Sequence, residues 1–291
     1  MYTGQCDPSS KGANKLLKGK HANLHTVCNN GLTFYCFQHL SECPEIRHGI
    51  TTRRGGNSLP PFDSLNMARS VGDNAAHVAV NRRRVQAQFD GMEPVYLKQV
   101  HSNIVVALDG VTTGEAPYLH GAADAVVTDR PGRLLTILVA DCQPVILYDP
   151  VRGVIANIHS GWRGSITNII GHTVAVMKKR FACRPADILA GIGPSLGPCC
   201  AEFIHYRDEI PPSLWSYQVA ENHFDFWSLS RDQLVAAGLR PQHVEVAGIC
   251  SRCRNDLFFS YRAANITGRM AAVIGLRPSS RAGQTVVRYP T

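Results

Sequence analysis

Residues 134–164 read LLTILVADCQPVILYDPVRGVIANIHSGWRG, and this stretch decides the fold. Apolar runs at 134–140, 145–148 and 154–159, rich in β-branched residues, have the length and composition of buried strands. The segment DPVRG at 149–153 separates the last two runs and is typical of a turn, with proline at a favoured turn position. The stretch therefore predicts two neighbouring antiparallel strands joined by a short turn.

Two reactive side chains, Cys142 and His159, lie near the ends of these strands. If the turn pairs Tyr148 with Gly153, the two side chains are directly opposite, with Cβ atoms about 5 Å apart. That separation suits two ligands of one metal ion, or a thiol and its general base. Taken singly, a cysteine in an apolar strand is more often a small buried hydrophobe. The turn-like SGWRG and a helix from about residue 164 favour a functional pair, because helix N–H groups beside Arg163 attract anions.

Outside this stretch, strand-like segments alternate with helical patterns, which is typical of an α/β fold. We expect strands at 32–37, 95–97, 104–108, 125–128, 134–140, 145–148, 154–159, 188–192 and 270–276. We expect helices at 75–89, with Asp73 as its N-cap, at 165–180 and at 230–237. These patterns leave the order of the strands open.

The composition is that of a globular protein, with 291 residues, of which 44% are hydrophobic and 18% charged. The longest apolar stretch, LLTILVA, is far shorter than the roughly 20 residues that a transmembrane helix needs. The N-terminal residues also lack the apolar segment of a secretory signal. We therefore expect no membrane partner, a cytoplasmic location, and reduced thiols for the ten cysteines.

The ends of the chain show no hydrophobic period, so we predict a flexible basic tail at 1–30 and a flexible C-terminal tail at 277–291. The catalytic domain is expected at 31–276. Of the formal charge of +8, each tail contributes +3, which leaves +2 for the folded part. The basic balance thus says little about the substrate, and since no RNA- or DNA-binding motif is present, we expect no nucleic-acid partner.

A third candidate ligand is His101 in YLKQVHSN, at the end of a predicted strand. Two histidines and a cysteine that leave one tetrahedral position open are typical of a catalytic zinc site. The separations of 41 and 17 residues match no short ligand motif, so spacing alone does not establish this ligand. Asp141, beside the cysteine, either orients a ligand or caps a strand end, and the sequence leaves both interpretations open.

Other cysteine patterns give weaker signals. Cys250 and Cys253 form a CxxC, but no second CxxC or histidine pair stands at zinc-finger spacing, so we do not expect a structural zinc. Cys199 and Cys200 follow GIGPSLGP, which lacks the ending of a nucleotide-binding Walker loop. The H-x-E…P-C-x-x-C signature of zinc deaminases is also absent.

The segments LKQVHSN, AADAVVTDRPG, VADCQPVILYDP, NIHSGWRGS, GIGPSLGPCC and FFSYRAANITGR occur in this order in one known family. Over residues 48–276 the chain resembles the laccase-domain family, also called multicopper polyphenol oxidases or peptidoglycan editing factors. The resemblance implies a single-domain layered α-β-β-α sandwich with mixed sheets, similar to toxin-type cysteine hydrolases. It implies a metal held by His101, Cys142 and His159. The chain departs from the family at Ser160, often Ala, and at Ala263, where a second Arg is usual.

The resemblance further implies a zinc-dependent purine nucleoside phosphorylase acting on adenosine, inosine, guanosine and methylthioadenosine, with adenosine deaminase activity. Its partners are then purine nucleosides and phosphate, and we expect a monomer or small homo-oligomer.

Phosphorolysis needs a cation for phosphate. The candidates are Arg53, Arg163 and Arg262. Arg53 is the first choice, with a catalytic role beside Cys142 and His159, because paired glycines in TTRRGG let backbone approach a ligand.

Three alternatives remain from the sequence. The first is an amide hydrolase that uses Cys142 and His159 in peptidoglycan precursor editing. The second is a copper-dependent polyphenol oxidase, because two imidazoles and a thiolate also bind copper. The third, a basic nucleic-acid-binding module, is the least supported because the sequence shows no aromatic RNA-binding signature.

Overall fold

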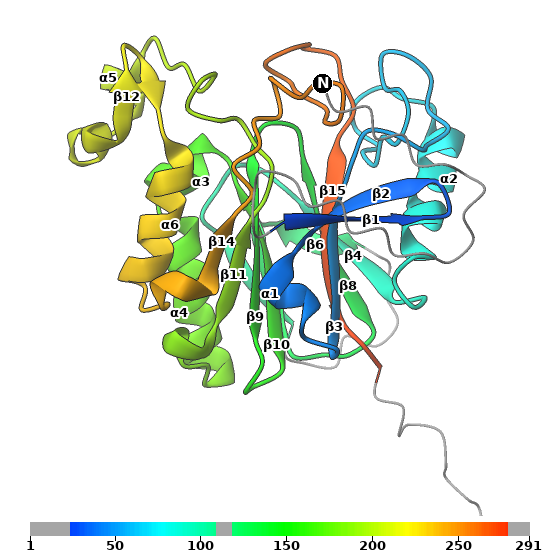
Figure 1. The fold of residues 1–291 in the computed structure, drawn as a ribbon, viewed down its shortest axis with the longest axis horizontal. Helices are drawn as coiled ribbons and strands as arrows, with labels where there is room; N and C mark the ends of the chain where they lie inside the picture. The colour runs from blue at the N-terminus through cyan, green and yellow to red at the C-terminus, as the bar shows by residue number, and fades with distance from the viewer. Residues whose placement is uncertain (1–23, 109–117, 279–291) are drawn as a thin grey trace, which may run out of the picture.

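The computed structural model describes residues 24–108 and 118–278, in which two large mixed sheets form the centre (Figure 1). The first sheet has the strand order β1 (Leu24–Asn29), β2 (Leu32–Phe37), β3 (Ile46–Thr51), β15 (Met270–Leu276), β8 (Arg133–Val139), β4 (Glu93–Lys98), β6 (Tyr118–Ala122). The second has the order β14 (Val244–Val246), β11 (Leu189–Ile192), β9 (Gln143–Asp149), β10 (Val154–Ser160), β7 (Ala125–Thr128), β5 (Val105–Leu108). A small hairpin joins β12 (Gln218–Ala220) to β13 (His223–Phe224).

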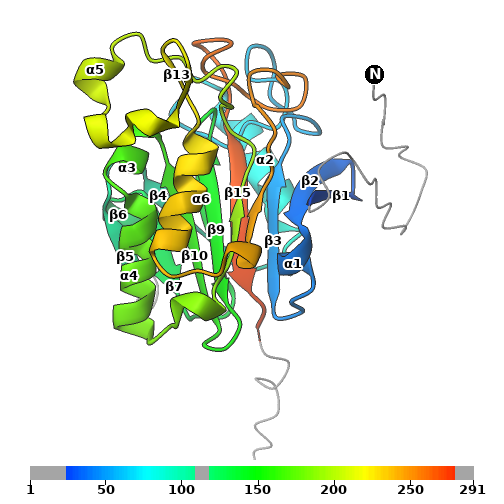
Figure 2. The same cartoon turned by 60° about the vertical axis from the view of Figure 1, so that its left-hand side comes forward.

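Helices cover the outer faces of the two sheets. Helix α2 (Ala75–Gln86) lies against the first sheet, and α4 (Ile169–Phe181) and α6 (Phe226–Ala236) cover the second (Figure 2). The remaining helices are short: α1 (Gln38–Ser41), α3 (Trp162–Ile166), α5 (Tyr206–Glu209), and 3-10 turns at Pro185–Asp187, Pro212–Tyr217 and Pro241–His243. The layers thus run helix, sheet, sheet, helix, as the resemblance implies. No helix in the described ranges is long and apolar enough to cross a membrane.

Strand β8 shows how the sequence builds these layers. Leu135, Ile137 and Val139 face the core between the two sheets. Leu134 and Leu138 point to the opposite face and pack in the cluster that contains α2. Side chains alternate between the two faces of a strand, and both faces are covered here, so apolar side chains occupy both faces of the strand.

All nine expected strands are present, with ends that differ by at most two residues. The N-terminal boundary was wrong, because part of the predicted tail at 1–30 forms β1, which pairs with β2. The two strands meet at Asn30 and Gly31, whose φ angles of 49° and 76° are those of a tight hairpin turn. The folded part therefore extends back to Leu24. Residues 1–23 and 279–291 of the two predicted tails lie outside the described residues.

The expected helices differ at their ends. Helix α2 ends at Gln86, and its N-cap is Asn74, which accepts a hydrogen bond from the Ala76 amide, rather than Asp73. The helix predicted at 165–180 is split into α3 and α4, because Asn168 has a left-handed φ of 56°. Helix α6 begins four residues earlier than expected, where the Asp225 side chain accepts two backbone amides.

The central hairpin forms as predicted, but its register differs. Tyr148 pairs with a residue two positions beyond Gly153, and residues 150–153 form the loop. The Asp149 carboxylate accepts two amides of this loop, and Gly153 takes a φ of 63° to close it. Cys142 therefore precedes β9 and does not face His159 across the ladder.

Candidate metal centre

His101, Cys142 and His159 nevertheless converge at one end of the two sheets. His101 follows β4, Cys142 joins β8 to β9, and His159 lies on β10. Their ligand atoms all lie within 4.8 Å of one another, and the Cys142 Sγ is 3.7 Å from His101 Nε2. The two sheets thus bring together side chains that the spacing in the sequence could not.

The carboxylate of Asp124 organises this cluster, and the sequence analysis missed it. His159 donates its Nδ1 proton to Asp124 at 2.7 Å, which leaves Nε2 for the cluster. The same carboxylate accepts the backbone amides of Val100, His101 and Ser102. The only sequence signal was its place in AADAVV, directly before β7. A carboxylate behind a histidine that fixes its tautomer is typical of metal sites.

The charges of Cys142, His159 and Asp124 support one another. Burial raises the pKa of Cys142, but His159 and His101 outweigh it and lower that pKa to about 6. Burial lowers the pKa of His159, but Cys142 and Asp124 outweigh it and raise that pKa to about 9. Burial likewise opposes ionisation of Asp124, but hydrogen bonds from His159 and Ser102 hold its pKa well below the usual range. Near neutral pH the metal-free chain therefore holds a thiolate, an imidazolium and a carboxylate in contact.

The backbone conformations of His101 and Gly161 also help to place the candidate metal ligands. His101 has a left-handed φ of 60°, a conformation that is uncommon outside glycine and is held here by the amide bonds to Asp124. Gly161 lies against the cluster. A Cβ at Gly161 would lie 2.7 Å from His101 Cδ2 and 3.2 Å from Cys142 Sγ, so only glycine fits. His101 is exposed, so one side of the cluster faces solvent.

The donor set fits a zinc ion. Two imidazoles and a thiolate are ordinary zinc ligands and leave one tetrahedral position open. The same donors accept copper, and the geometry does not distinguish the two metals.

Arg53, the first phosphate candidate, is engaged by its own surroundings. Its Nε donates to the Asp63 carbonyl and its Nη1 to the Asn255 carbonyl, both at 2.9 Å. The guanidinium also pairs with the Asp63 carboxylate and lies 4.8 Å from the Phe259 ring centre. These contacts join two loops that line a hollow of about 290 Å³. None of the contacts described for Arg53 reaches the metal-ligand residues.

The other two arginine candidates lie near the cluster of His101, Cys142 and His159. Arg163 is close in sequence to His159, and the Arg262 amide donates to Asp141, the neighbour of Cys142. Arg163 is exposed on α3, two residues after Gly161, with its guanidinium 4.3 Å from the Trp162 ring centre. Arg262 donates through Nη1 to the carbonyls of Cys200 and Glu202.

A further arginine, Arg269, was not among the candidates. Burial lowers the pKa of Arg269, and the negative charges of Cys142 and Asp141 act in the opposite direction. A cation in the field of the thiolate therefore lies in the TGR segment of FFSYRAANITGR.

The contacts of Asp141 match neither interpretation that the sequence left open. Its carboxylate accepts Ser251 Oγ and the Arg262 amide, both at 2.6 Å. Asp141 therefore holds two loops behind Cys142 rather than orienting a histidine ligand.

Four other cysteines form a second cluster. Cys199, Cys200, Cys250 and Cys253 have sulfur atoms within 4.8 Å of one another. From the sequence, a structural zinc is not expected, because no second CxxC or histidine pair stands at zinc-finger spacing from the CxxC. That reason was wrong, because the fold brings Cys199 and Cys200 beside the CxxC from about fifty residues away.

The two mixed sheets and the cluster of His101, Cys142 and His159 define an α/β protein with a candidate metal centre at one end of its sheets. Residues 47–277 match the family described as multi-copper polyphenol oxidoreductase laccase, and the chain belongs to this family.

Relatives of known name and structure agree with this assignment. The chain is 36% identical over 245 residues to the purine nucleoside phosphorylase YlmD of Geobacillus stearothermophilus, covering 79% of this chain and 89% of that protein. It is 36% identical over 234 residues to the purine nucleoside phosphorylase YfiH of Escherichia coli K12, covering 78% and 92%. The crystal structure of the Geobacillus YlmD superposes with a TM-score of 0.75 at 30% identity, covering 91% of this chain and 100% of that one.

Proposed function

We propose that the protein is a zinc-dependent purine nucleoside phosphorylase acting on adenosine, inosine, guanosine and methylthioadenosine, with adenosine deaminase activity. The convergence of His101, Cys142 and His159 on one open-sided point carries the proposal, because it supplies three metal ligands and leaves one position for substrate. The names of relatives at 36% identity support the nucleoside and phosphate as substrates.

In phosphorolysis, a phosphate oxygen bonds to the ribose C1′ while the C1′–N9 bond breaks. The electron pair of that bond leaves with the base, which must then gain a proton. A bound zinc ion supplies a Lewis acid that polarises a substrate oxygen or nitrogen. Asp124 keeps the Nδ1 proton of His159 in place, so that Nε2 would be available to the metal beside the Cys142 thiolate.

Phosphate requires cations that are not already committed to the fold. We propose Arg163 for this role, because its side chain is exposed beside Gly161. The Arg262 amide donates to Asp141, next to Cys142, and we propose Arg262 as a second phosphate ligand whose guanidinium must first exchange its bonds to the Cys200 and Glu202 carbonyls. Arg53 remains a proposed phosphate ligand and catalytic residue, but its guanidinium must first exchange its bonds to the neighbouring carbonyls.

The test is release of base from adenosine or inosine by the purified zinc-loaded protein, in phosphate buffer and in phosphate-free buffer. We expect base and ribose 1-phosphate only with phosphate, and loss of the reaction in Cys142→Ala. Cys43→Ala is the matched control, since Cys43 lies outside both clusters. No base released by the zinc-loaded wild type contradicts the proposal.

One observation favours a second function. With its pKa lowered to about 6, Cys142 is a thiolate beside a protonated His159, and Asp124 orients that histidine, as in cysteine hydrolases. An amide hydrolase of this kind acts on peptidoglycan precursors without metal. Iodoacetamide then modifies Cys142 in metal-free protein, and chelators spare the amidase activity. Activity that is lost with a chelator and restored by zinc rejects this alternative.

A further inference from the structure

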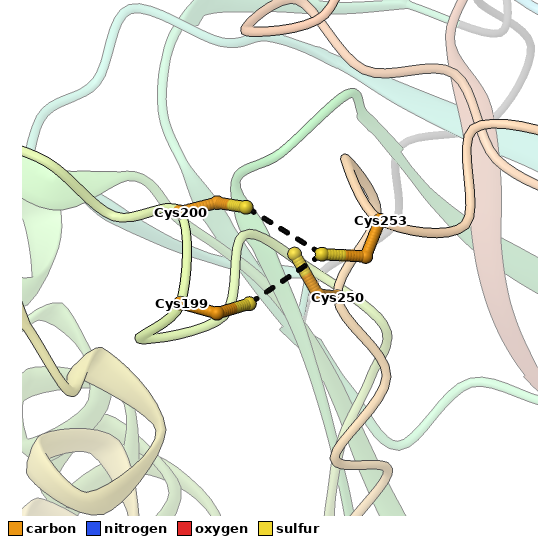
Figure 3. A group of neighbouring side chains, drawn as sticks. All are labelled: Cys199, Cys200, Cys250 and Cys253. Atoms are coloured by element: carbon orange, nitrogen blue, oxygen red, sulfur yellow. Dashed lines mark hydrogen bonds between the residues drawn. The ribbon is translucent and has the colours of Figure 1, made fainter.

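The second cysteine cluster lies outside the site already described. Cys199 and Cys200 are in the loop that follows β11, and Cys250 and Cys253 are in the turns that follow β14. Figure 3 shows the four sulfur atoms pointing toward one point from two separate loops. The sulfur atoms of Cys253 and Cys199 are 3.6 Å apart, and those of Cys253 and Cys200 are 3.5 Å apart.

These distances distinguish two kinds of cysteine cluster. A disulfide holds its sulfur atoms about 2.05 Å apart. Four thiolates around zinc at Zn–S distances of about 2.3 Å lie at the corners of a tetrahedron with edges of about 3.8 Å. The observed 3.5 and 3.6 Å are close to the tetrahedron edge and far from a covalent bond. All four cysteines are free thiols.

Backbone hydrogen bonds hold both cysteine-bearing loops in place. In the CxxC turn, the Arg254 amide donates to the Cys250 carbonyl, and Cys250 forms a parallel bridge with Ser195. In the other loop, the Cys200 amide donates to the Gly197 carbonyl at 2.9 Å. A Cβ on Gly197 would lie 3.1 Å from the Cys250 Cβ, so glycine lets the two loops approach.

Burial divides the cluster into a fixed half and an accessible half. Cys200 and Cys250 are each 7% exposed, whereas Cys199 and Cys253 are exposed. A preformed inner pair and an outer pair open to solvent give an ion a path into a site that closes around it.

We propose that Cys199, Cys200, Cys250 and Cys253 bind one zinc ion in a closed tetrahedral site with a structural role. Each of the four thiols gives up its proton on binding. The four thiolates fill the tetrahedral shell of the ion, so no coordination position is left for substrate. The site joins the loop after β11 to the loop after β14.

The position of this site links it to the candidate metal centre. Ser251, within the CxxC turn, donates to Asp141, the neighbour of Cys142. Arg262 donates to the Cys200 carbonyl through its guanidinium and to Asp141 through its amide. Zinc bound by the four cysteines therefore fixes the loops that hold Arg262 and Asp141 beside the other site.

The test uses full-length Cys142→Ala protein, in which only the four-cysteine site keeps its ligands. We expect this protein to carry one zinc per chain by elemental analysis. Reconstituted with Co²⁺, it should show the intense thiolate-to-cobalt absorption and visible bands of tetrahedral sulfur ligation. The Cys142→Ala/Cys199→Ser protein should lose the zinc and these bands; since Cys199 is exposed, this change leaves the fold intact by far-UV circular dichroism.

Cys142→Ala/Cys43→Ser is the matched control and should keep both zinc and absorption, because Cys43 lies outside both clusters. Less than a tenth of an equivalent of zinc in Cys142→Ala overturns the proposal. So does a disulfide among the four cysteines, found by mass spectrometry after alkylation without reductant, or the iron absorption of a four-sulfur iron site. This test measures the metal content of a protein that lacks Cys142. Its outcome therefore does not depend on whether the protein has phosphorylase activity.

Discussion

The two ligand clusters are joined through neighbouring loops but differ in the type and number of their donor atoms. The first, His101, Cys142 and His159, mixes nitrogen and sulfur donors, has one exposed member, and is supported by Asp124. The second, made of Cys199, Cys200, Cys250 and Cys253, contains sulfur donors alone. Three donors leave a coordination position, whereas four close the shell.

The proposed function and the further inference assign separate tasks to the two clusters. The open shell with a buried carboxylate behind it would receive substrate, and the closed shell of thiolates would hold two loops together. Asp141 connects them, because it precedes Cys142 in the chain and accepts the Ser251 hydroxyl from the CxxC turn.

Asp124→Asn should damage the first cluster most. Asp124 is fully buried, pairs with His159 and holds three backbone amides, so its loss leaves a buried imidazolium without its counter-charge. We expect a loss of about 3–5 kcal/mol in the free energy of unfolding and zinc affinity lowered about 10–100-fold at this cluster. Denaturant unfolding and zinc titration measure both.

Asp129→Asn is the matched control, since Asp129 forms a surface pair with Arg130. Its unfolding free energy should change by less than about 0.5 kcal/mol. If Asp124→Asn resembles this control, Asp124 does not organise the cluster.

Gly161→Ala should crowd the first cluster and spare the second. Its Cβ would lie 2.7 Å from the His101 ring, so the ring must move, at a cost of about 2 kcal/mol. Zinc affinity at the first cluster should fall at least tenfold while zinc at the four cysteines is retained. Gly153→Ala serves as control, because Gly153 has a positive φ but open space around it. It should lower stability by about 1–2 kcal/mol without changing zinc binding.

Ser251→Ala should weaken the connection between the clusters. It removes the 2.6 Å hydrogen bond to the Asp141 carboxylate, and we expect about 1.5 kcal/mol less stability. The value of kcat/KM should fall several-fold, because Arg262 is held by the same carboxylate. Ser228→Ala removes a similar bond to Asp225 at the start of α6 and should leave kcat/KM unchanged. Equal effects of the two variants on kcat/KM argue against a connection.

His48 gives the smallest expected effect and lies outside both clusters. Burial, and then the neighbouring His25 and His39, lower the pKa of His48 to about 3, and its Nε2 accepts the Phe37 amide. Since the unfolded chain binds this proton near its ordinary pKa of 6.5, stability is full above that pH and is lost as the pH falls toward 3. Between about pH 7.5 and 5.5 the loss should be about 1.4 kcal/mol.

His48→Gln keeps an acceptor for the Phe37 amide but does not titrate. The free energy of unfolding of this variant should therefore not show the loss of about 1.4 kcal/mol between pH 7.5 and 5.5. The difference between the two unfolding curves across that pH range measures it. An identical acid dependence in wild type and variant means that His48 is not the group responsible. The result also separates acid loss of the fold from acid loss of metal.

The sequence predicted those parts of the fold that depend on local apolar pattern. Strands such as β8 and β15 are apolar on both faces, so their positions followed from composition alone. Strand β1 was missed because it is a partly polar strand at the sheet edge, although Asn30-Gly31 was a usable hairpin signal. The register of β9 and β10 depended on how Asp149 and Gly153 close the loop, which a turn motif does not specify.

The candidate site was predicted where motifs carried it and missed where only folding brings residues together. His101, Cys142 and His159 were found, but Asp124 comes from a separate strand connection and gave little signal. The four-cysteine cluster was missed for the same reason, because its halves are adjacent only in three dimensions.

The most direct test of the account is the zinc content of the purified wild type beside that of Cys142→Ala. The account predicts that the substitution removes one equivalent of zinc, the one held with His101 and His159, and leaves the zinc of the four cysteines in place. A zinc content that Cys142→Ala does not change would contradict the central claim.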